Sequence, residues 1–279
     1  MKVFYKKETL ESHLNTLNKN VSVGFVPTMG ALHEGHLSLI ERAKSENDIV
    51  VVSIFVNPTQ FDNKRDLKKY PKDLKKDINF LKNVKCDVVF SPDADEIYDR
   101  KIKAEAFDFD GLENEMEGKH RKGHFDGVGT IVKKLLEIVM PDTAYFGEKD
   151  FQQLQIVKKL VEKYHLPVKI EGCTIFRELD GLAMSSRNIR LTKNQREEAP
   201  IIYKTLNRAK EKFKTESINM VTNWVKNQFK NNTILDLEYF EIANETTLKS
   251  AKHKRKGNNY RAFIAVFVGE IRLIDNMAL

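Results

Sequence analysis

Two histidines that stand three residues apart, His33 and His36, are the side chains best suited to chemistry in this chain. They follow an apolar run, Val21 to Val26, and a Pro-Thr-Met-Gly turn, which together predict a strand, a tight turn and a helix start. Side chains three residues apart share one face of a helix. A helix start carries unpaired N–H groups and partial positive charge. The stretch therefore predicts a nucleotide triphosphate site, with Gly35 leaving the backbone open to the ligand.

Other readings of this stretch fit less well. The glycine spacing from Gly30 to Gly35 resembles a phosphate-binding P-loop, but His36 and Leu37 stand where that loop has its Lys and its Ser or Thr. A zinc-protease motif needs two histidines four residues apart. The His-x-Gly-His pattern instead resembles the signature of nucleotidyl-transferring enzymes of the class I aminoacyl-tRNA synthetase type. The alternative is two histidines on an ordinary surface turn.

A second cluster follows the apolar run from Ile49 to Val56, where Asn57 and Gln60 flank Pro58. Proline ends a strand ladder because it lacks an N–H. The amide of Gln60 both donates and accepts hydrogen bonds, so it suits a small polar acid. An Asn-Pro turn with an incidental Gln is the alternative interpretation.

A third cluster, Tyr145 to Gln153, runs from a predicted strand through Gly147 into a helix start. Lys149 is suited to neutralising phosphate charge that grows in a transition state. Asp150 either caps the helix or binds a ribose hydroxyl. Gln153 falls one helical turn later and faces the same way as Asp150.

A fourth cluster, Met184 to Asn188, places two serines and Arg187 in a polar loop after Gly181. Two hydroxyls and a guanidinium make a clamp for an anion. The loop resembles the Lys-Met-Ser-Lys-Ser loop of the class I superfamily, except that Ala183 replaces the first Lys. Taken alone, Ser-Ser-Arg is a commonplace sequence.

Short β-rich runs alternate with helical patterns up to about Cys173, which predicts a doubly wound, Rossmann-like parallel sheet. The expected strands are 21–26, 49–56, 87–90, 143–146 and 168–170, and the expected helices are 36–46, 73–83, 128–139 and 151–164. Ligands of such sheets bind at the carboxyl ends of the strands, where the four clusters fall.

The sequence changes character after about Phe176. Helical stretches at 192–213 and 217–230 precede β-like runs at 235–242, 260–268 and 271–274. We therefore expect a domain of residues 1–175 that binds the nucleotide and a smaller α+β domain of residues 176–279 that closes over it.

The bulk composition fits a soluble protein, and a cytoplasmic location is expected. The chain is 41% hydrophobic and 31% charged, and its longest apolar run is too short to span a bilayer. The N-terminus lacks the apolar core of a signal peptide, and Cys86 and Cys173 have no metal-type spacing. The net charge of +7 raises the possibility of nucleic-acid binding, but most basic residues are lysines spread beside Asp and Glu. Lys252 to Lys256, the one dense basic cluster, lies in an expected loop.

Together the four clusters closely resemble the pantothenate synthetase family, the pantoate–β-alanine ligases. The resemblance runs from about Val23 to Asn188 and includes Tyr70-Pro71, His124-Phe125-Asp126-Gly127-Val128 and Asp180-Gly181-Leu182-Ala183-Met184. The ending Arg272-Leu273-Ile274-Asp275-Asn276 also resembles the C-terminus of that family.

The resemblance implies an ATP-dependent condensation of (R)-pantoate with β-alanine in the pathway to pantothenate and coenzyme A. The products are pantothenate, AMP and pyrophosphate, and the intermediate is a pantoyl adenylate. Mg²⁺ is expected because ATP chemistry generally needs it, held mostly by phosphates and with no protein ligand assigned. The resemblance also implies a homodimer formed through the sheet domain. Neither a nucleic acid nor a membrane is expected as a partner.

Residue roles carry over by position. His36 is the implied proton donor, His33 a phosphate partner, and Lys149 and Arg187 stabilise the growing charge. Gln60 and Gln153 contact pantoate, and Asn57, His124 and Arg121 lie nearby. The residues implied to hold ATP are Met29, Gly30, Ala31, Leu32, His33, Glu34, Gly35, His36, Gly147, Glu148, Lys149, Asp150, Phe176, Met184, Ser185, Ser186 and Arg187.

Three residues depart from the family pattern. Phe176 stands where a Val usually meets the nucleotide, Lys122 replaces a Pro, and Gly129 replaces a Cys. No Ser-His-Asp or Cys-His arrangement is evident, which agrees with a noncovalent acyl intermediate.

Two other functions remain as alternatives. A cytidylyl- or adenylyl-transferase on the same fold would have no use for Gln60 and Gln153 as acid-binding amides. A nucleic-acid-binding module would show salt-sensitive binding without ATP.

Overall fold

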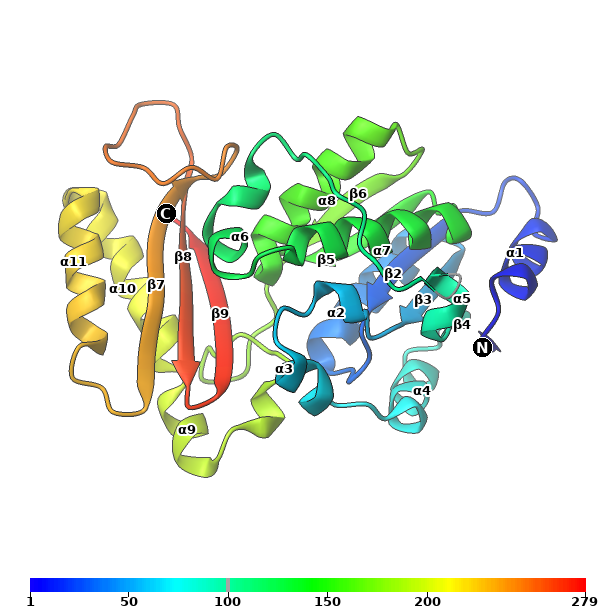
Figure 1. The fold of residues 1–279 in the computed structure, drawn as a ribbon, viewed down its shortest axis with the longest axis horizontal. Helices are drawn as coiled ribbons and strands as arrows, with labels where there is room; N and C mark the ends of the chain where they lie inside the picture. The colour runs from blue at the N-terminus through cyan, green and yellow to red at the C-terminus, as the bar shows by residue number, and fades with distance from the viewer. Residues whose placement is uncertain (99–100) are drawn as a thin grey trace.

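The computed structural model describes residues 1–98 and 101–279 and shows a large α/β part beside a small sheet backed by helices (Figure 1). The large sheet is parallel throughout. Its order is β1 (Lys2–Phe4), β4 (Val88–Phe90), β3 (Ile49–Ile54), β2 (Val23–Thr28), β5 (Thr143–Gly147) and β6 (Lys169–Cys173). The chain runs outward from β2 through β3 to β4 and then returns to β5 on the other side of β2. This reversal confirms the predicted doubly wound sheet.

Helices cover both faces of this sheet. One face packs against α1 (Lys7–Asn15), α7 (His124–Val139) and α8 (Phe151–Tyr164), and the other against α2 (Glu34–Glu46) and α4 (Leu74–Asn83). Val50, Val51 and Val52 of β3 are each fully buried, as a strand covered on both faces requires. The shorter elements are α3 (Lys64–Lys69), α5 (Ala94–Tyr98), α6 (Met116–His120), and the 3₁₀ turns η1 (Pro58–Gln60), η2 (Leu112–Asn114), η3 (Glu148–Asp150) and η4 (Asn188–Arg190).

The C-terminal part is an antiparallel sheet of β7 (Leu235–Asn244), β8 (Tyr260–Val268) and β9 (Ile271–Ala278), preceded by α9 (Lys193–Glu198), α10 (Ile201–Thr215) and α11 (Ile218–Phe229). One face of the sheet forms a core with α10 and α11. From the other face, Phe263 and Ala243 pack into the core of the larger part. We propose that residues 1–175 and 176–279 are two domains, because each sheet has its own helices and its own core.

Several element boundaries differ from those expected from the sequence. The strand β2 continues to Thr28, whose hydroxyl donates to the Ser53 carbonyl oxygen at 2.7 Å, so the predicted turn at residues 27–30 begins later. Helix α7 begins at His124, after Gly123 at φ +77°. The predicted helical stretch 192–213 is two helices, because Pro200 lies between them and cannot donate a backbone hydrogen bond.

The charged N-terminal elements β1 and α1 were not predicted at all. In β1, Lys2 and Phe4 pair with Val88 and Phe90 at the edge of the large sheet. Leu10 of α1 is fully buried against that sheet. In the described residues, no helix is both long and apolar enough to cross a membrane. Cys86 and Cys173 are buried free thiols.

Candidate active site

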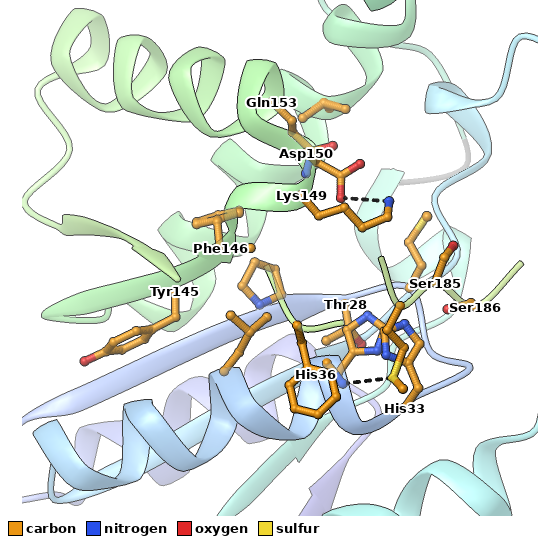
Figure 2. A pocket seen from close by; sticks show the side chains of 18 of the residues that line it. Thr28, His33, His36, Tyr145, Phe146, Lys149, Asp150, Gln153, Ser185 and Ser186 are labelled. Carbon is orange, nitrogen blue, oxygen red and sulfur yellow. Dashed lines mark hydrogen bonds and ion pairs between the residues drawn. The ribbon is translucent and has the colours of Figure 1, made fainter. Parts of the chain in front are cut away.

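A cleft lies at the carboxyl ends of β2 and β5, where the chain reverses across the large sheet. Loops that leave adjacent parallel strands in opposite directions separate and leave a crevice between them. The cleft encloses about 230 Å³. The loop after β2 brings His33 and His36 to one side, and the turn after β5 brings Lys149 to the other (Figure 2).

The first side of the cleft, residues 28–36, is here called the histidine wall. It bends sharply after β2, with Gly30 at φ +74° and Ala31 at φ +50°. The buried carboxylate of Asp77 accepts hydrogen bonds from the backbone N–H groups of Ala31 (3.0 Å) and Leu32 (2.7 Å). A Cβ at Gly30 would meet an Asp77 oxygen at 2.9 Å, so this turn requires glycine for space as well as for conformation.

The rings of His33 and His36 lie together at the start of α2, with their centroids 4.0 Å apart. This confirms that the two imidazoles share one face. The Nδ1 atoms of both rings are buried and have no hydrogen-bond partner within the described part of the chain. Unpaired buried ring nitrogens are costly unless a ligand satisfies them. The pair therefore has the character of a binding site.

Gly35 has a different role from the expected one. A Cβ at this position would lie 3.0 Å from Cε1 and 3.1 Å from Nδ1 of His33, so the glycine makes room for that ring. Its N–H is not open to a ligand, because it points at Sδ of Met184 at 3.4 Å. The N–H groups of His36 and Leu37 donate to the His33 carbonyl oxygen. The helix start thus offers fewer free donors than the sequence suggested.

Both imidazoles are neutral near pH 7. Burial, with a contribution from the Lys149 charge, lowers the pKa of His33 to about 4. Burial, followed by the proximity of His33 and Lys149, lowers the pKa of His36 well below its usual value. The ligand-free histidine wall therefore presents uncharged rings, each able to donate one N–H and to accept one proton.

Lys149 and Arg187 also line the cleft, and these two cations are here together called the cationic wall. Lys149 lies in η3, directly after β5, and its Nζ lies 3.7 Å from an oxygen of Asp150 (Figure 2). Asp150 does not cap α8, because its side chain makes no capping hydrogen bond there. Its carboxylate instead lines the cleft with Gln153 one turn further along. Of the two roles considered for Asp150, capping is excluded.

Arg187 comes from the loop between β6 and η4. Its Nη2 donates to a carboxylate oxygen of Asp66 in α3 at 2.7 Å, and Arg190 donates to the other oxygen of Asp66 at 2.8 Å. The guanidinium lies 5.7 Å from the ring centroid of Tyr70. The neighbouring Ser186 hydroxyl donates to the Ala31 carbonyl oxygen at 3.0 Å, so this loop lies against the histidine wall.

Asn57 and Gln60 add side-chain amides to the lining of the cleft. The Asn57 amide donates to the Gln60 side-chain oxygen at 3.1 Å and to the Gly127 carbonyl oxygen at 3.0 Å. The Gln60 amide points at Sδ of Met29, at 2.9 Å. Gly127 permits this arrangement, since a Cβ there would lie 2.3 Å from the Thr59 carbonyl oxygen. Helix α7 therefore packs directly on η1 and fixes Gln60.

His124 and Arg121 support the backbone of Gln60. The Gln60 carbonyl oxygen lies 2.8 Å from Nδ1 of His124 and 3.2 Å from Nη2 of Arg121. Burial and the Arg121 charge lower the pKa of His124 to about 4, so its Nδ1–H donates and its Nε2 accepts from Arg121 at 3.1 Å. Two cleft-adjacent side chains thus hold the turn that presents the amide.

The structure brings together most of the predicted site residues. The cleft is lined by Met29, His33, Gly35, His36, Asn57, Gln60, Gly147, Lys149, Asp150, Gln153, Phe176, Met184, Ser185, Ser186 and Arg187. Five predicted contacts do not line it. Gly30 and Leu32 of the histidine wall are buried, Ala31 and Glu148 are half-buried, and Glu34 is exposed.

Sequence reasoning missed the role of the apolar part of the lining. Val128, Ile131, Val132 and Leu135 of α7 form one side of the cleft, with Phe55 and Tyr70 nearby. Their helical spacing indicated only a core-facing stripe, which is also what they are. No local signal distinguishes a core residue at a cleft from one elsewhere.

Two of the departures from the family pattern have a structural context. Phe176 lines the cleft with 40% of its surface exposed, so an aromatic face replaces the expected small aliphatic one. At Gly129 an added Cβ would lie 2.9 Å from the Phe109 ring and 3.0 Å from the Phe107 ring, which explains the absence of a side chain. Lys122 is exposed.

Comparisons with known proteins agree along the whole chain. The family model described as Pantoate-beta-alanine ligase matches residues 2–278. The pantothenate synthetase of Christiangramia forsetii is 58% identical over 281 residues, covering 100% of this chain and 99% of that protein, and the one of Flavobacterium psychrophilum is 56% identical over 282 residues, covering 100% of both. Among solved structures, pantothenate synthetase from Thermus thermophilus is 37% identical with a TM-score of 0.90 and 99% of each chain covered. The pantoate-beta-alanine ligase of Francisella tularensis, complexed with beta-gamma ATP and beta-alanine, is 39% identical with a TM-score of 0.82, covering 100% of this chain and 97% of that one.

Proposed function

This chain belongs to the pantoate–β-alanine ligase family, and we propose the following course for the reaction in its cleft. The enzyme condenses pantoate with β-alanine at the expense of ATP and forms an amide bond. The observation that carries the assignment is the meeting of a neutral histidine pair, two cations and two amides in one cleft.

We propose that ATP lies between the histidine wall and the cationic wall. The unpaired Nδ1 atoms of His33 and His36 offer hydrogen-bonding sites to phosphate oxygens, and Lys149 and Arg187 supply positive charge. The loop of Met184, Ser185 and Ser186 covers the nucleotide, and Phe176 meets its base. The backbone from Gly147 to Asp150 borders the sugar side.

In this proposal, pantoate lies against the side-chain amides of Gln60 and Gln153. Its carboxylate and hydroxyls need hydrogen-bonding groups that both donate and accept, which Gln60 and Gln153 provide. Its geminal methyl groups need an apolar surface, which Val128, Ile131 and Leu135 provide. The apolar side of the cleft is thus the part that distinguishes pantoate from a phosphate ester.

The proposed chemistry has two steps. A carboxylate oxygen of pantoate attacks the α-phosphorus, the bond to the bridging oxygen of the β-phosphate breaks, and pyrophosphate leaves. The β-alanine amine then attacks the acyl carbon, the bond to AMP breaks, and the amine releases a proton. His36, as a neutral imidazole, donates a hydrogen bond to the leaving pyrophosphate, while Lys149 and Arg187 stabilise the charge on its oxygens.

We propose that Mg²⁺ accompanies the triphosphate, because this ion is commonly held by substrate phosphates and waters with few protein ligands. The described residues contain no group of three or more His, Cys, Asp or Glu side chains arranged to hold a metal ion. Asp77 is engaged by two backbone N–H groups of the histidine wall. We also propose a homodimer through the larger domain and a cytoplasmic location, as the family resemblance implies.

The test measures AMP and pyrophosphate with purified protein, ATP, Mg²⁺ and pantoate, with and without β-alanine. The proposal predicts pantothenate and AMP in equal amounts only when both acids are present. It further predicts one pyrophosphate per active site with pantoate alone. Nucleotide transfer to a phosphate ester, without a requirement for β-alanine, would contradict it.

A further inference from the structure

Asn276 of β9 reaches across from the C-terminal sheet to the turn that carries Lys149. Its side chain is buried, with 2% of the residue exposed. Nδ2 donates one hydrogen bond to the Glu148 carbonyl oxygen at 2.8 Å and a second to the Lys149 carbonyl oxygen at 2.9 Å. Both donors of the amide are therefore used on two successive carbonyls of η3.

The other half of the amide is equally occupied. Oδ1 of Asn276 accepts from Nη1 of Arg261 at 2.6 Å. The Arg261 guanidinium also donates to Glu245 at 2.8 Å and lies 3.9 Å from the centroid of the Phe151 ring. Phe151 is the first residue of α8, directly after η3. The arginine thus fixes which way the amide faces and contacts the same segment.

The turn that carries Lys149 has little local support of its own. Gly147 before it makes no side-chain cap, and Asp150 at its end makes none to α8. The Lys149 side chain is long and flexible, so its reach into the cleft depends on where its backbone is held. A misplacement of about 1 Å at a catalytic group can cost about 10²-fold in rate.

The residue before Asn276 acts on the other cation-bearing segment. Both carboxylate oxygens of buried Asp275 accept from Arg177, at 2.6 and 3.0 Å. Arg177 begins the loop that leads to Met184 and Arg187, and the Met184 N–H donates to the Phe176 carbonyl oxygen at 3.0 Å. Two successive residues of β9 therefore contact both segments that carry the cationic wall.

We infer that Asn276 is a positioning residue for Lys149, through which the C-terminal sheet sets the position of this cation in the cleft. The inference rests on the proposed function of Lys149 at the phosphates. These hydrogen bonds join the backbone of Lys149 to the second domain, so we expect a change at Asn276 to alter the reaction by way of Lys149.

The test is a double-mutant cycle of Asn276→Ala and Lys149→Ala, read as pantoate-dependent pyrophosphate release. In the wild-type background we expect Asn276→Ala to lower kcat by about 10- to 100-fold, with a smaller change in the KM for pantoate. In the Lys149→Ala background the same change should matter by less than about twofold, because residues that act through one another are not additive.

Asn276→Asp is the companion variant. It keeps the shape and the contact with Arg261 but replaces the two donors by a carboxylate oxygen, so it should lose as much kcat as alanine while staying folded. Asn244→Ala is the matched control, because Asn244 lies in the same sheet and the hydrogen bonds of its side chain go to its own turn at Thr246 and Thr247. Thermal unfolding of every variant checks the fold.

Equal losses from Asn276→Ala in both backgrounds would overturn the inference and reduce Asn276 to a structural residue. Wild-type kcat in Asn276→Asp would overturn it as well. The ATP dissociation constant, measured by calorimetry over the same cycle, needs no pantoate. A wild-type protein that binds ATP but releases no pyrophosphate with pantoate would contradict the proposed function, while non-additive ATP binding would still support the positioning role.

Discussion

The histidine wall and the cationic wall line one cleft but are held in different ways. The histidine wall is held within its own domain, by the Asp77 carboxylate under Ala31 and Leu32. The cationic wall is held from afar, with Asn276 on the backbone of Lys149 and Asp66 on the side chain of Arg187.

The two walls also differ in charge before ligand binds. The imidazoles are neutral and leave their Nδ1 atoms without partners in the described structure, whereas both cations have carboxylates nearby. In the proposed complex, the triphosphate meets uncharged imidazoles and two cations whose carboxylate neighbours compete with the phosphates. We therefore expect the histidine wall to set the position of the bound nucleotide and the cationic wall to move when the nucleotide binds.

The strongest test of the histidine wall is His36→Ala. We expect pantoate-dependent pyrophosphate release to fall by about 10²- to 10⁴-fold, because this change removes the proposed donor to the leaving group. Thermal unfolding should remain close to that of wild type. If the variant releases pyrophosphate at the wild-type rate, His36 is not the donor, and the role proposed for the histidine wall is contradicted.

The corresponding change in the cationic wall is Arg187→Ala. Removing one group that stabilises transition-state charge typically costs about 10²–10³ in kcat, and we expect a loss in that range. The KM for pantoate should change little, since Arg187 is proposed to bind the phosphates. Steady-state kinetics with each substrate varied would show this; a rise confined to the KM for pantoate would argue against the placement.

The histidine wall could be predicted from the sequence more completely than the cationic wall. The spacing of His33, Gly35 and His36 after an apolar strand indicated a strand, a turn and a helix, and local spacing is what determines that arrangement. Lys149 and Arg187 were also identified, but not the partners Asp66 and Asn276. These partners lie 121 and 127 residues away from the cations. Such pairs depend on tertiary packing, which no local pattern records.

The same contrast between local patterns and tertiary packing explains which parts of the fold were predicted. Strands buried on both faces, such as β3, were predicted from their continuous apolar runs. The charged β1 and α1 were missed because pairing with β4 and burial of Leu10 stabilise them, rather than local propensity. The mistaken role of Gly35 has a similar cause, since the His33 ring and the Met184 sulfur that surround it are brought there by the fold.

The neutrality of the histidine wall predicts a pH-dependent stability in the absence of ligand. The pKa of His33 is about 4 in the folded chain and about 6.5 in the unfolded chain, so only the unfolded chain takes up this proton between those pH values. Stability should fall as the pH decreases from about 6.5 to about 4, by up to about 3 kcal/mol from this residue.

Urea unfolding of wild type and of His33→Asn over this pH range would measure the effect. The variant should show a shallower decline, with a remaining slope to which His13, His36 and His124 contribute because their pKa values are also lowered. An identical pH dependence in the two proteins would mean that the ring of His33 takes up its proton as readily in the folded chain as in the unfolded chain. The histidine wall would then respond to ligand as the cationic wall does.

The smallest expected effect tests whether Asp66 holds Arg187 in place or competes with the phosphates for it. Its ion pair with Asp66 must open, at least in part, when the guanidinium turns to a phosphate, and Arg190 remains to neutralise the carboxylate. Asp66→Asn weakens this competition, so the KM for ATP should fall by about two- to fivefold, as partly exposed ion pairs contribute about 0–1 kcal/mol. Glu270→Gln, which disrupts only the exposed pair with Lys69, is the control and should leave the KM for ATP unchanged. A loss of kcat with unchanged KM would instead show that Asp66 holds Arg187 in the reacting complex, and both walls would then be fixed.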